Sequence, residues 1–356
     1  MLFLLVILII LGLVFPRSRI LFLCQGIFIF FLIGLRVHDP DHYIYQVEYL
    51  SAPSIYYKFA DFPGWNLWMK FFINRGYAFD QFILIMAAIC VVLMLIGIYK
   101  IGKKLGGYIS FALAFFLIYP LGHEATQMRT FFADALIFLV LPFLLRDVKG
   151  LKNKILNYSI YFIVVYIATT IHTLSYFFVL VGIVFILLKS CKYELQILIF
   201  GSIVTVILIS SNVLSDILIG FLNTGKQDHW ISNGTVSFGK LIPILITVII
   251  WWIAYIEIQE LRNTSQFISI DKNNLLNIQK FINTIFLILP LLSYDITFNR
   301  LWRIYLMLLY LITGMYAYSE HKENSRKKIY ILILFFITIF VIFIYENEMS
   351  ILNSLF

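Results

Sequence analysis

The sequence predicts an all-α, polytopic membrane protein with about 12 transmembrane helices. Of its 356 residues, 62% are hydrophobic and only 13% are charged, whereas a soluble domain usually carries about 25% charged residues. Apolar runs recur from one end of the chain to the other, and basic residues gather in alternate connections between them. We therefore expect residues 1–356 to form a single integral membrane domain.

Twelve apolar runs are the candidates for membrane spans. Several are shorter than the ~20 residues that a straight span prefers, so flanking residues would have to enter the membrane. The first run is expected to be a retained helix, because no basic region precedes it and no small-residue cleavage site follows. The runs are about 2–15, 20–36, 81–99, 108–121, 128–145, 155–171, 174–188, 195–212, 241–258, 280–292, 301–318 and 329–345.

The basic residues predict the orientation. Eighteen of the 27 lie in one set of alternate connections, which the positive-inside rule places in the cytoplasm. Twelve spans then put both termini outside. The eighteen are Arg17, Arg19, Lys100, Lys103, Lys104, Arg146, Lys149, Lys152, Lys154, Lys189, Lys192, Arg262, Lys272, Lys280, Lys322, Arg326, Lys327 and Lys328.

Four of the other basic residues lie at the predicted outer ends of spans: Arg36, Arg129, Arg300 and Arg303. Topology does not need positive charge on that side, which favours a role in binding. Arg300 and Arg303 are three residues apart, so one helix face would carry both. Two neighbouring guanidiniums repel each other and favour an anion such as phosphate between them. Anchoring to lipid headgroups is the alternative.

Two outer connections are long. Residues 37–80 contain Trp65, Trp68 and Phe72 at helical spacing, which fits a short amphipathic helix at the membrane interface. Residues 212–239 are polar and would form either a lid or a simple connection. On the other side, residues 257–279 are expected to form a polar cytoplasmic connection.

The stretch from Gly122 to Asp134 places several polar groups between two apolar runs. In a helix, Glu124, Gln127 and Asp134 would share a stripe, and charge at this depth usually faces a cavity or a partner. The alternatives are an internal Glu–Arg pair and an anion site that uses Arg129.

His172 and Asp39 are candidates for acid–base chemistry. His172 lies at a tight outer turn, where a histidine is either a structural hydrogen-bonding residue or an acid, base or donor to an anion. Asp39 precedes Pro40 and Asp41, which first suggests a turn, although the carboxylates could also orient a sugar hydroxyl or take its proton.

Several function classes find no support. The chain has no Walker motif, no dinucleotide fingerprint and no HExxH spacing, so nucleotide-driven chemistry and a metal site are not predicted. Cys24, Cys90 and Cys191 have no metal or disulfide spacing. The net charge of +8 reflects topology rather than nucleic-acid binding.

The order of these features resembles the EpsG-type group of Wzy-like bacterial polysaccharide (O-antigen or exopolysaccharide) polymerases. An arginine followed by aspartates and tyrosines comes first. Gln-Met-Arg-Thr-Phe-Phe-Ala (127–133), Ile-His-Thr (171–173) and Arg-x-x-Arg-x-Tyr (300–305) follow. The chain departs from the pattern in having Phe131 and Phe132 after the arginine.

The resemblance implies a membrane glycosyltransferase that polymerises undecaprenyl-pyrophosphate-linked repeat units on the outer face of the bacterial inner (cytoplasmic) membrane, without nucleotide, metal or cofactor. Its partners would be these lipid-linked glycans, membrane lipids and a chain-length regulator protein. Arg129, Arg300, Arg303 and Arg36 would bind the pyrophosphate, and the base candidates are His172, Asp39 and Glu124.

Two alternatives stay open. An O-antigen ligase-like transferase would use the same donor with another acceptor. A flippase or transporter of a lipid-linked or anionic solute would place charges along a path through the spans, and the sequence shows few charges there.

Overall fold

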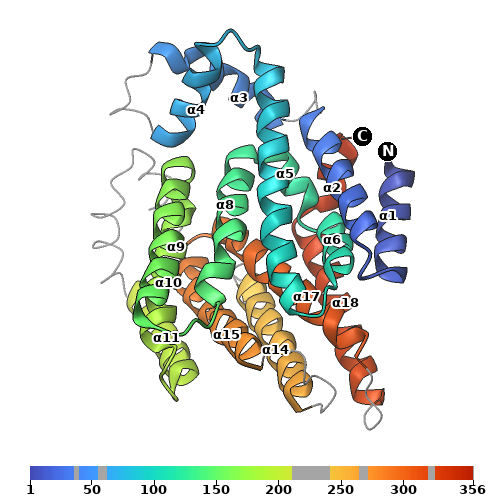
Figure 1. Ribbon diagram of the computed structural model, residues 1–356, viewed down its shortest axis with the longest axis vertical. Coiled ribbons are helices and arrows are strands. Elements are labelled where there is room, and N and C mark those ends of the chain that lie inside the picture. The colour runs from blue at the N-terminus through green and yellow to red at the C-terminus, as the bar shows by residue number, and fades with distance from the viewer. Residues whose placement is uncertain (36–39, 55–61, 211–240, 264–271, 320–324, 356) are drawn as a thin grey trace.

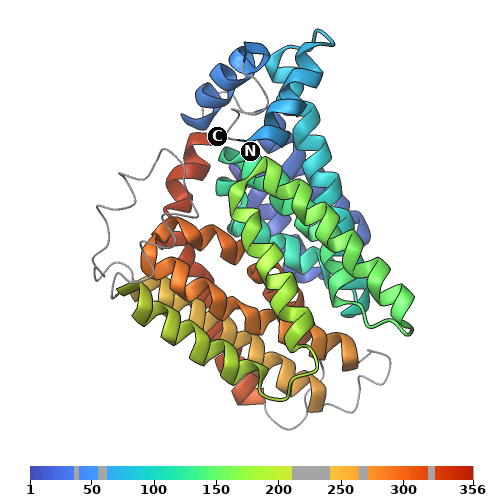
Figure 2. The ribbon, with the colours of Figure 1, turned by 90° about the vertical axis from the view of Figure 1, so that its left-hand side faces the viewer.

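The computed structural model describes residues 1–35, 40–54, 62–210, 241–263, 272–319 and 325–355. These residues form α-helices, short 3₁₀ helices and turns, without strands. Figures 1 and 2 show a helical bundle whose upper end carries α3 and α4, with the start of α1 and helix α19 toward the same end. The predicted outer segment 212–239 lies outside the described residues, as do Arg36 and Asp39.

The first half of the chain contains α1 (Leu2–Val14), α2 (Arg19–Gly34), α3 (Pro40–Ser51), η1 (Ala52–Ser54), α4 (Pro63–Ile73), α5 (Phe79–Lys104), α6 (Ile109–Ile118), α7 (Leu121–Thr126), α8 (Met128–Leu145) and α9 (Leu151–Ile171). The second half contains η3 (Thr173–Ser175), α10 (Tyr176–Leu188), α11 (Glu194–Ser210), α14 (Leu241–Asn263), α15 (Lys272–Asn283), η6 (Thr284–Leu287), α16 (Ile288–Tyr294), η7 (Ile296–Leu301), α17 (Trp302–Ala317), α18 (Ser325–Tyr345) and α19 (Glu348–Leu355).

In its described part, each of the twelve apolar runs is mainly helical, which supports the predicted all-α membrane class. Six helices of the described residues are long and apolar enough to cross a membrane. The other helical runs are shorter, and α6 has only ten residues, or about 15 Å of helix against a ~30 Å hydrocarbon core. The total of twelve crossings therefore stays a prediction.

The predicted stripe from Glu124 to Asp134 does not lie on one continuous helix. Pro120 separates α6 from α7, because proline lacks the amide that would continue the helix. A second interruption follows at Gln127, whose φ of −107° and ψ of 64° are not helical. The short helix α7 is consequently a separate element that presents Glu124 to the C-terminal half of the chain.

Helices α5 and α8 approach each other closely at Gly97. A Cβ atom added at Gly97 would lie 2.2 Å from the carbonyl oxygen of Phe138, so only glycine permits this contact. Pro142, four residues after Phe138, lies inside α8 and donates no amide hydrogen to that carbonyl. The small residue and the proline together let α8 pack deep in the bundle.

One helix lies fully buried in the centre of the bundle, and several outer helices expose apolar side chains. Helix α17 is buried on all sides from Trp302 to Tyr316, as expected for a helix that is apolar all round. By contrast, α1, α9, α10 and α18 expose many large apolar side chains, including Phe3, Ile163, Leu187 and Phe340. Exposed apolar surface of this extent is typical of contact with lipid.

The segment predicted as an outer loop is largely helical in its described parts. Helix α4 contains the expected Trp65, Trp68 and Phe72, but Trp65 and Phe72 are buried against the bundle rather than free for a membrane interface. The Trp65 ring packs against Tyr45 of α3 and Phe82 of α5. The expected short helix therefore exists as α4, but part of its aromatic face packs on the protein. Its position at the membrane interface stays a prediction.

The polar segment predicted as a cytoplasmic connection is also mostly helical. Residues 257–263 continue α14, and α15 begins at Lys272. Buried amides of α15 have partners: Asn277 donates to the Leu145 carbonyl at 3.0 Å, and Asn283, which follows the predicted segment, donates to Glu194 Oε1 at 2.8 Å. Hydrogen bonds to other helices thus make burial of these polar residues tolerable.

Candidate functional site

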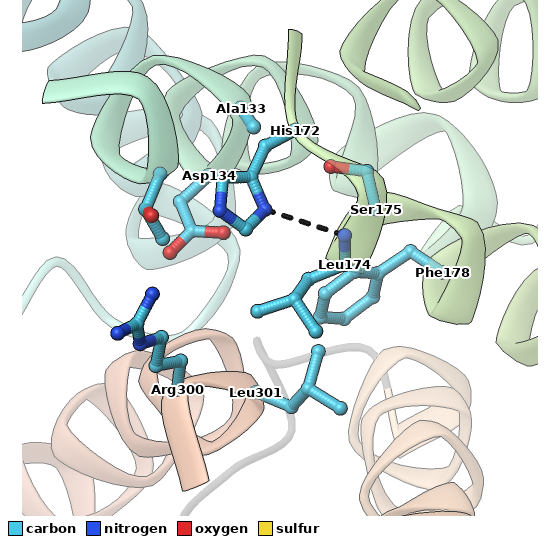
Figure 3. A pocket seen from close by; sticks show the side chains of 9 residues that line it. Ala133, Asp134, His172, Leu174, Ser175, Phe178, Arg300 and Leu301 are labelled. Carbon is cyan, nitrogen blue, oxygen red and sulfur yellow. Dashed lines mark hydrogen bonds between the residues drawn. The ribbon is translucent and has the colours of Figure 1, made fainter. Parts of the chain in front are cut away.

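A small pocket lies where the starts of α8, η3 and the end of η7 meet. Its polar lining consists of Thr130 and Asp134 from α8, His172 and Ser175 around η3, and Arg300 from η7. Figure 3 shows Arg300 reaching from one side toward Asp134 and His172 on the other. The pocket volume is about 10 Å³, which is room for about one water molecule.

His172 has a defined ring orientation. Its Nδ1 accepts a hydrogen bond from the backbone N–H of Leu174 at 3.3 Å (Figure 3). In the neutral imidazole, Nε2 must then carry the proton. This tautomer makes His172 a hydrogen-bond donor through Nε2, and its role as the base that headed the candidates from the sequence stays a prediction.

Asp134 is the carboxylate that lines this pocket. One face of α8 carries Thr130, Ala133 and Asp134 into the lining, because residues three and four apart share a helix face. Asp134 Oδ2 is buried without a donor among the described residues, and the Asp134 carboxyl group lies against the carboxyl group of Glu124. Two buried carboxyl groups in contact can share a proton, and a buried acceptor without a donor is costly. This arrangement suits a group that takes a proton or a hydrogen bond from a ligand.

Arg129 adjoins the pocket through aromatic rings. Its guanidinium lies 4.2 Å from the ring centre of Phe62 and 5.3 Å from that of Tyr45. The Phe62 ring in turn stacks on His172, with centroids 6.0 Å apart. Arg129 Nη1 also contacts both oxygens of Glu48 on α3, at 3.0 and 3.3 Å, so a surface carboxylate and two rings hold its fork in place.

Arg303 is bound inside the protein. Its side chain is 2% exposed, and its Nη1 lies 3.3 Å from Oε1 of Glu124, which is 1% exposed. Nη2 donates to Gln127 Oε1 at 2.8 Å. Burial raises the pKa of Glu124, and the Arg303 charge opposes this shift. The internal Glu–Arg pair considered from the sequence thus exists, with Arg303 as the partner instead of Arg129.

A third cluster joins α7 to the C-terminal helix. His123 Nε2 lies 3.5 Å from Glu346 Oε2 and 3.4 Å from Glu348 Oε2, and the Gly122 amide donates to Glu348. Burial lowers the pKa of His123 to about 3 and raises that of Glu348 to about 8. Asn299 donates to Glu346 at 2.6 Å, so this cluster also orients the residue next to Arg300.

The structure thus brings His172 and Arg300 to one pocket, with Arg129 beside it and the Glu124–Arg303 pair behind it. Burial and the Arg303 charge lower the pKa of Arg300, and the Asp41 carboxylate opposes this. Sequence reasoning did not propose roles for Asp134, Glu48, Glu346 or Glu348. Asp134 was visible as an acidic residue in an apolar run, whereas the other three give no local signal.

No group of three or more His, Cys, Asp or Glu residues in the described parts of the chain has a metal-binding arrangement. The charged groups at the pocket are instead guanidiniums, an imidazole and carboxylates. They can bind an anion and exchange a proton next to it.

The described residues thus form an all-helical protein of the membrane type, with a pocket lined by arginine, histidine and aspartate at the ends of its helices. Residues 19–354 match the EpsG family. The chain belongs to this family of polysaccharide polymerase-like proteins, so membership points to a membrane protein of the polysaccharide-polymerase type. No curated protein and no solved structure matches the chain.

Proposed function

We propose that this protein polymerises undecaprenyl-pyrophosphate-linked oligosaccharide repeat units on the outer face of the bacterial inner membrane. The observation that carries the proposal is the convergence of Arg300, His172 and Asp134 on one pocket in a member of this family. This lining pairs donors for an anion with an acceptor for a proton. The small pocket volume means that the helix ends must separate when substrate binds.

The proposed reaction transfers the growing glycan from its lipid carrier to a hydroxyl group of the next lipid-linked unit. The hydroxyl oxygen attacks the anomeric carbon, the bond to pyrophosphate oxygen breaks, and undecaprenyl pyrophosphate leaves with the bonding electrons. Arg300 and Arg129 would stabilise the charge on the leaving group, and His172 would donate from Nε2. Asp134 would accept the hydroxyl proton.

Arg303 takes a different role in this proposal from the one that the sequence suggested. Because its guanidinium is buried, lies in an ion pair with Glu124 and donates from Nη2 to Gln127, it would position α7 and η7 rather than bind pyrophosphate. Glu124, which is buried in the same pair, would neutralise Arg303 rather than act as the base. No metal enters the proposed step, so polymerisation is expected to persist in EDTA.

Deletion of the gene followed by glycan analysis on a gel tests the proposal against its alternatives. Loss of a polymerase leaves the acceptor with one repeat unit. Loss of a ligase leaves free polymer on the lipid carrier, and loss of a flippase removes surface repeats altogether. The ligase alternative would share this donor site, so only the product distinguishes it.

The proposed sidedness has its own test, which uses single cysteines in a background without Cys24, Cys90 and Cys191. Tyr43 on α3 and Lys149 between α8 and α9 are both exposed. We expect an impermeant thiol reagent to label a cysteine at position 43 from outside and one at position 149 only after the membrane is opened. The reverse pattern would place the pocket in the cytoplasm and refute the reaction.

A further inference from the structure

A second cavity lies among the ends of α8, α9, α10 and α15, away from the pocket of Arg300. Its volume is about 290 Å³, which approaches the lower end of the range for small-ligand sites. Three lysines from three helices line it: Lys154 of α9, Lys189 at the end of α10 and Lys280 of α15. Asp147, between α8 and α9, is the acidic residue in the lining.

The three ammonium groups are not equivalent. Lys280 Nζ lies 3.0 Å from Glu194 Oε2 and also donates to the backbone carbonyl of Lys189. Among the described residues, no carboxylate lies within 4.0 Å of the ammonium groups of Lys154 or Lys189. Burial lowers the pKa of Lys189, and the charges of Lys154 and Lys280 lower it further while Asp147 opposes them. The cavity therefore holds positive charge that its own walls do not fully neutralise.

The positive-inside bias alone does not explain this arrangement. Lys149 and Lys152 belong to the same stretch of chain and are exposed like Lys154, yet they do not line the cavity. Topology requires only that lysines lie on this side. Topology does not require that three lysines from three different helices line one cavity.

Neutral polar groups complete the lining. Asn277 lies in the cavity wall, and its Nδ2 donates to the Leu145 carbonyl at 3.0 Å, which fixes the orientation of its carboxamide. Tyr158 and Ser190 add hydroxyl groups. Ammonium groups suit phosphate oxygens, while Asp147 and the amides suit hydroxyl groups beside the phosphate.

We propose that this cavity binds a phosphate ester that carries hydroxyl groups, at the end of the protein opposite the polymerisation site. The site does not depend on the proposed polymerase activity. Two sources share this chemistry. One is an anionic phospholipid headgroup, because Ile155 and Leu187 next to the lining expose apolar surface, 73% in the case of Leu187. The other is a soluble phosphate ester.

The test compares two double variants of the purified full-length protein. Lys154→Gln/Lys189→Gln removes the two lysines that lack a close carboxylate, and Lys149→Gln/Lys152→Gln removes the same charge outside the cavity. Thermal shift in detergent is titrated with phosphatidylglycerol, phosphatidylcholine, glycerol 3-phosphate and inorganic phosphate. Since charge-assisted hydrogen bonds are lost, we expect apparent affinity to fall about tenfold or more in the cavity variant alone.

The ligands distinguish the two sources. A shift with phosphatidylglycerol but not glycerol 3-phosphate supports a lipid headgroup, and a shift with glycerol 3-phosphate supports a soluble ester. Equal loss of affinity in both double variants would show that the overall positive charge of the surface causes the binding, and it would overturn the proposal. A wild-type protein that responds to none of the phosphate compounds, or equally to phosphatidylcholine, would overturn it as well.

Discussion

Arg300 and Arg303 are three residues apart, but they belong to two different regions. Arg303 lies in a sealed region, by which we mean that its side chain is 2% exposed, forms an ion pair with Glu124 and donates a hydrogen bond to Gln127. Arg300 lies in a second region, where it lines a small pocket together with His172 and Asp134 (Figure 3). The chain passes directly from η7 into α17 between these two residues, and Arg303 extends into the bundle while Arg300 lines the pocket.

This difference shows that an arginine at a helix end is not by itself evidence for ligand binding. A buried guanidinium that is already paired with a carboxylate stabilises the arrangement of helices, and its charge is largely compensated. A guanidinium that faces a cavity retains the capacity to bind an anion. Substitutions should therefore separate the two residues by phenotype, with folding affected in one case and activity in the other.

The largest effect is expected for Arg303→Met. Removal of one member of a buried ion pair leaves the other charge uncompensated and costs about 3–5 kcal/mol. We expect the variant protein to be lost from the membrane or to melt well below the wild type in detergent. Immunoblotting and a thermal melt measure this.

The matched control is the double variant Arg303→Met/Glu124→Gln, which removes both charges. It should recover much of the lost protein level, since replacement of both partners avoids the unpaired carboxylate. A normal protein level for Arg303→Met alone, together with loss of the glycan ladder, would contradict the structural role. It would indicate that Arg303 binds substrate.

The next effect is expected for Arg300→Ala. Loss of one donor to a developing anion typically slows a reaction roughly a hundred- to thousandfold, so we expect normal protein levels and no ladder on a glycan gel. Arg300→Lys should recover little, because an ammonium group cannot form a bidentate fork. A full ladder from the lysine variant would favour lipid anchoring, and one from the alanine variant would remove Arg300 from the mechanism.

A smaller effect is expected for Arg129→Lys, which keeps the charge but loses the planar group between Phe62 and Tyr45. We expect polymerisation to fall roughly ten- to hundredfold, within the range of one lost oriented donor. Glu48→Gln is the companion variant. The partly exposed Arg129–Glu48 pair contributes at most about 1 kcal/mol, so this change should leave the melting temperature almost unaltered.

If Glu48→Gln destabilised the protein as strongly as Arg303→Met, the Arg129–Glu48 pair would have a structural role like that of the Arg303–Glu124 pair. Full activity of Arg129→Lys would show that its fork is not needed.

The smallest effect concerns the pH dependence of stability through Glu348. Burial raises the pKa of Glu348 from 4.5 to about 8, so the folded protein binds the proton more tightly than the unfolded chain. Its stabilising contribution is complete below about pH 4.5 and declines as the pH rises toward 8. In Glu348→Gln, the melting temperature should therefore fall less steeply over this interval than in the wild type. Equal slopes in both proteins would contradict the assignment.

The sequence alone determined the class of the protein. Apolar runs and scarce charge predict membrane helices because burial of hydrocarbon and satisfaction of backbone hydrogen bonds leave few alternatives in lipid. The runs coincide with observed helices, and the four ordered motifs pointed to the family that residues 19–354 match. Arg129, His172 and Arg300 were identified individually because their polarity conflicts with the apolar runs around them.

Only the tertiary structure decided which of these charged residues have a partner within the protein. Glu48 with Arg129, Glu124 with Arg303, and Glu346 and Glu348 with His123 are pairs between residues far apart in the chain. No local period encodes such pairs, because they depend on how α3 packs against α8 and on how α7 packs against α17 and α19. The same holds for Asp134 and for the lysine-lined cavity, since burial and convergence arise when separate helices meet.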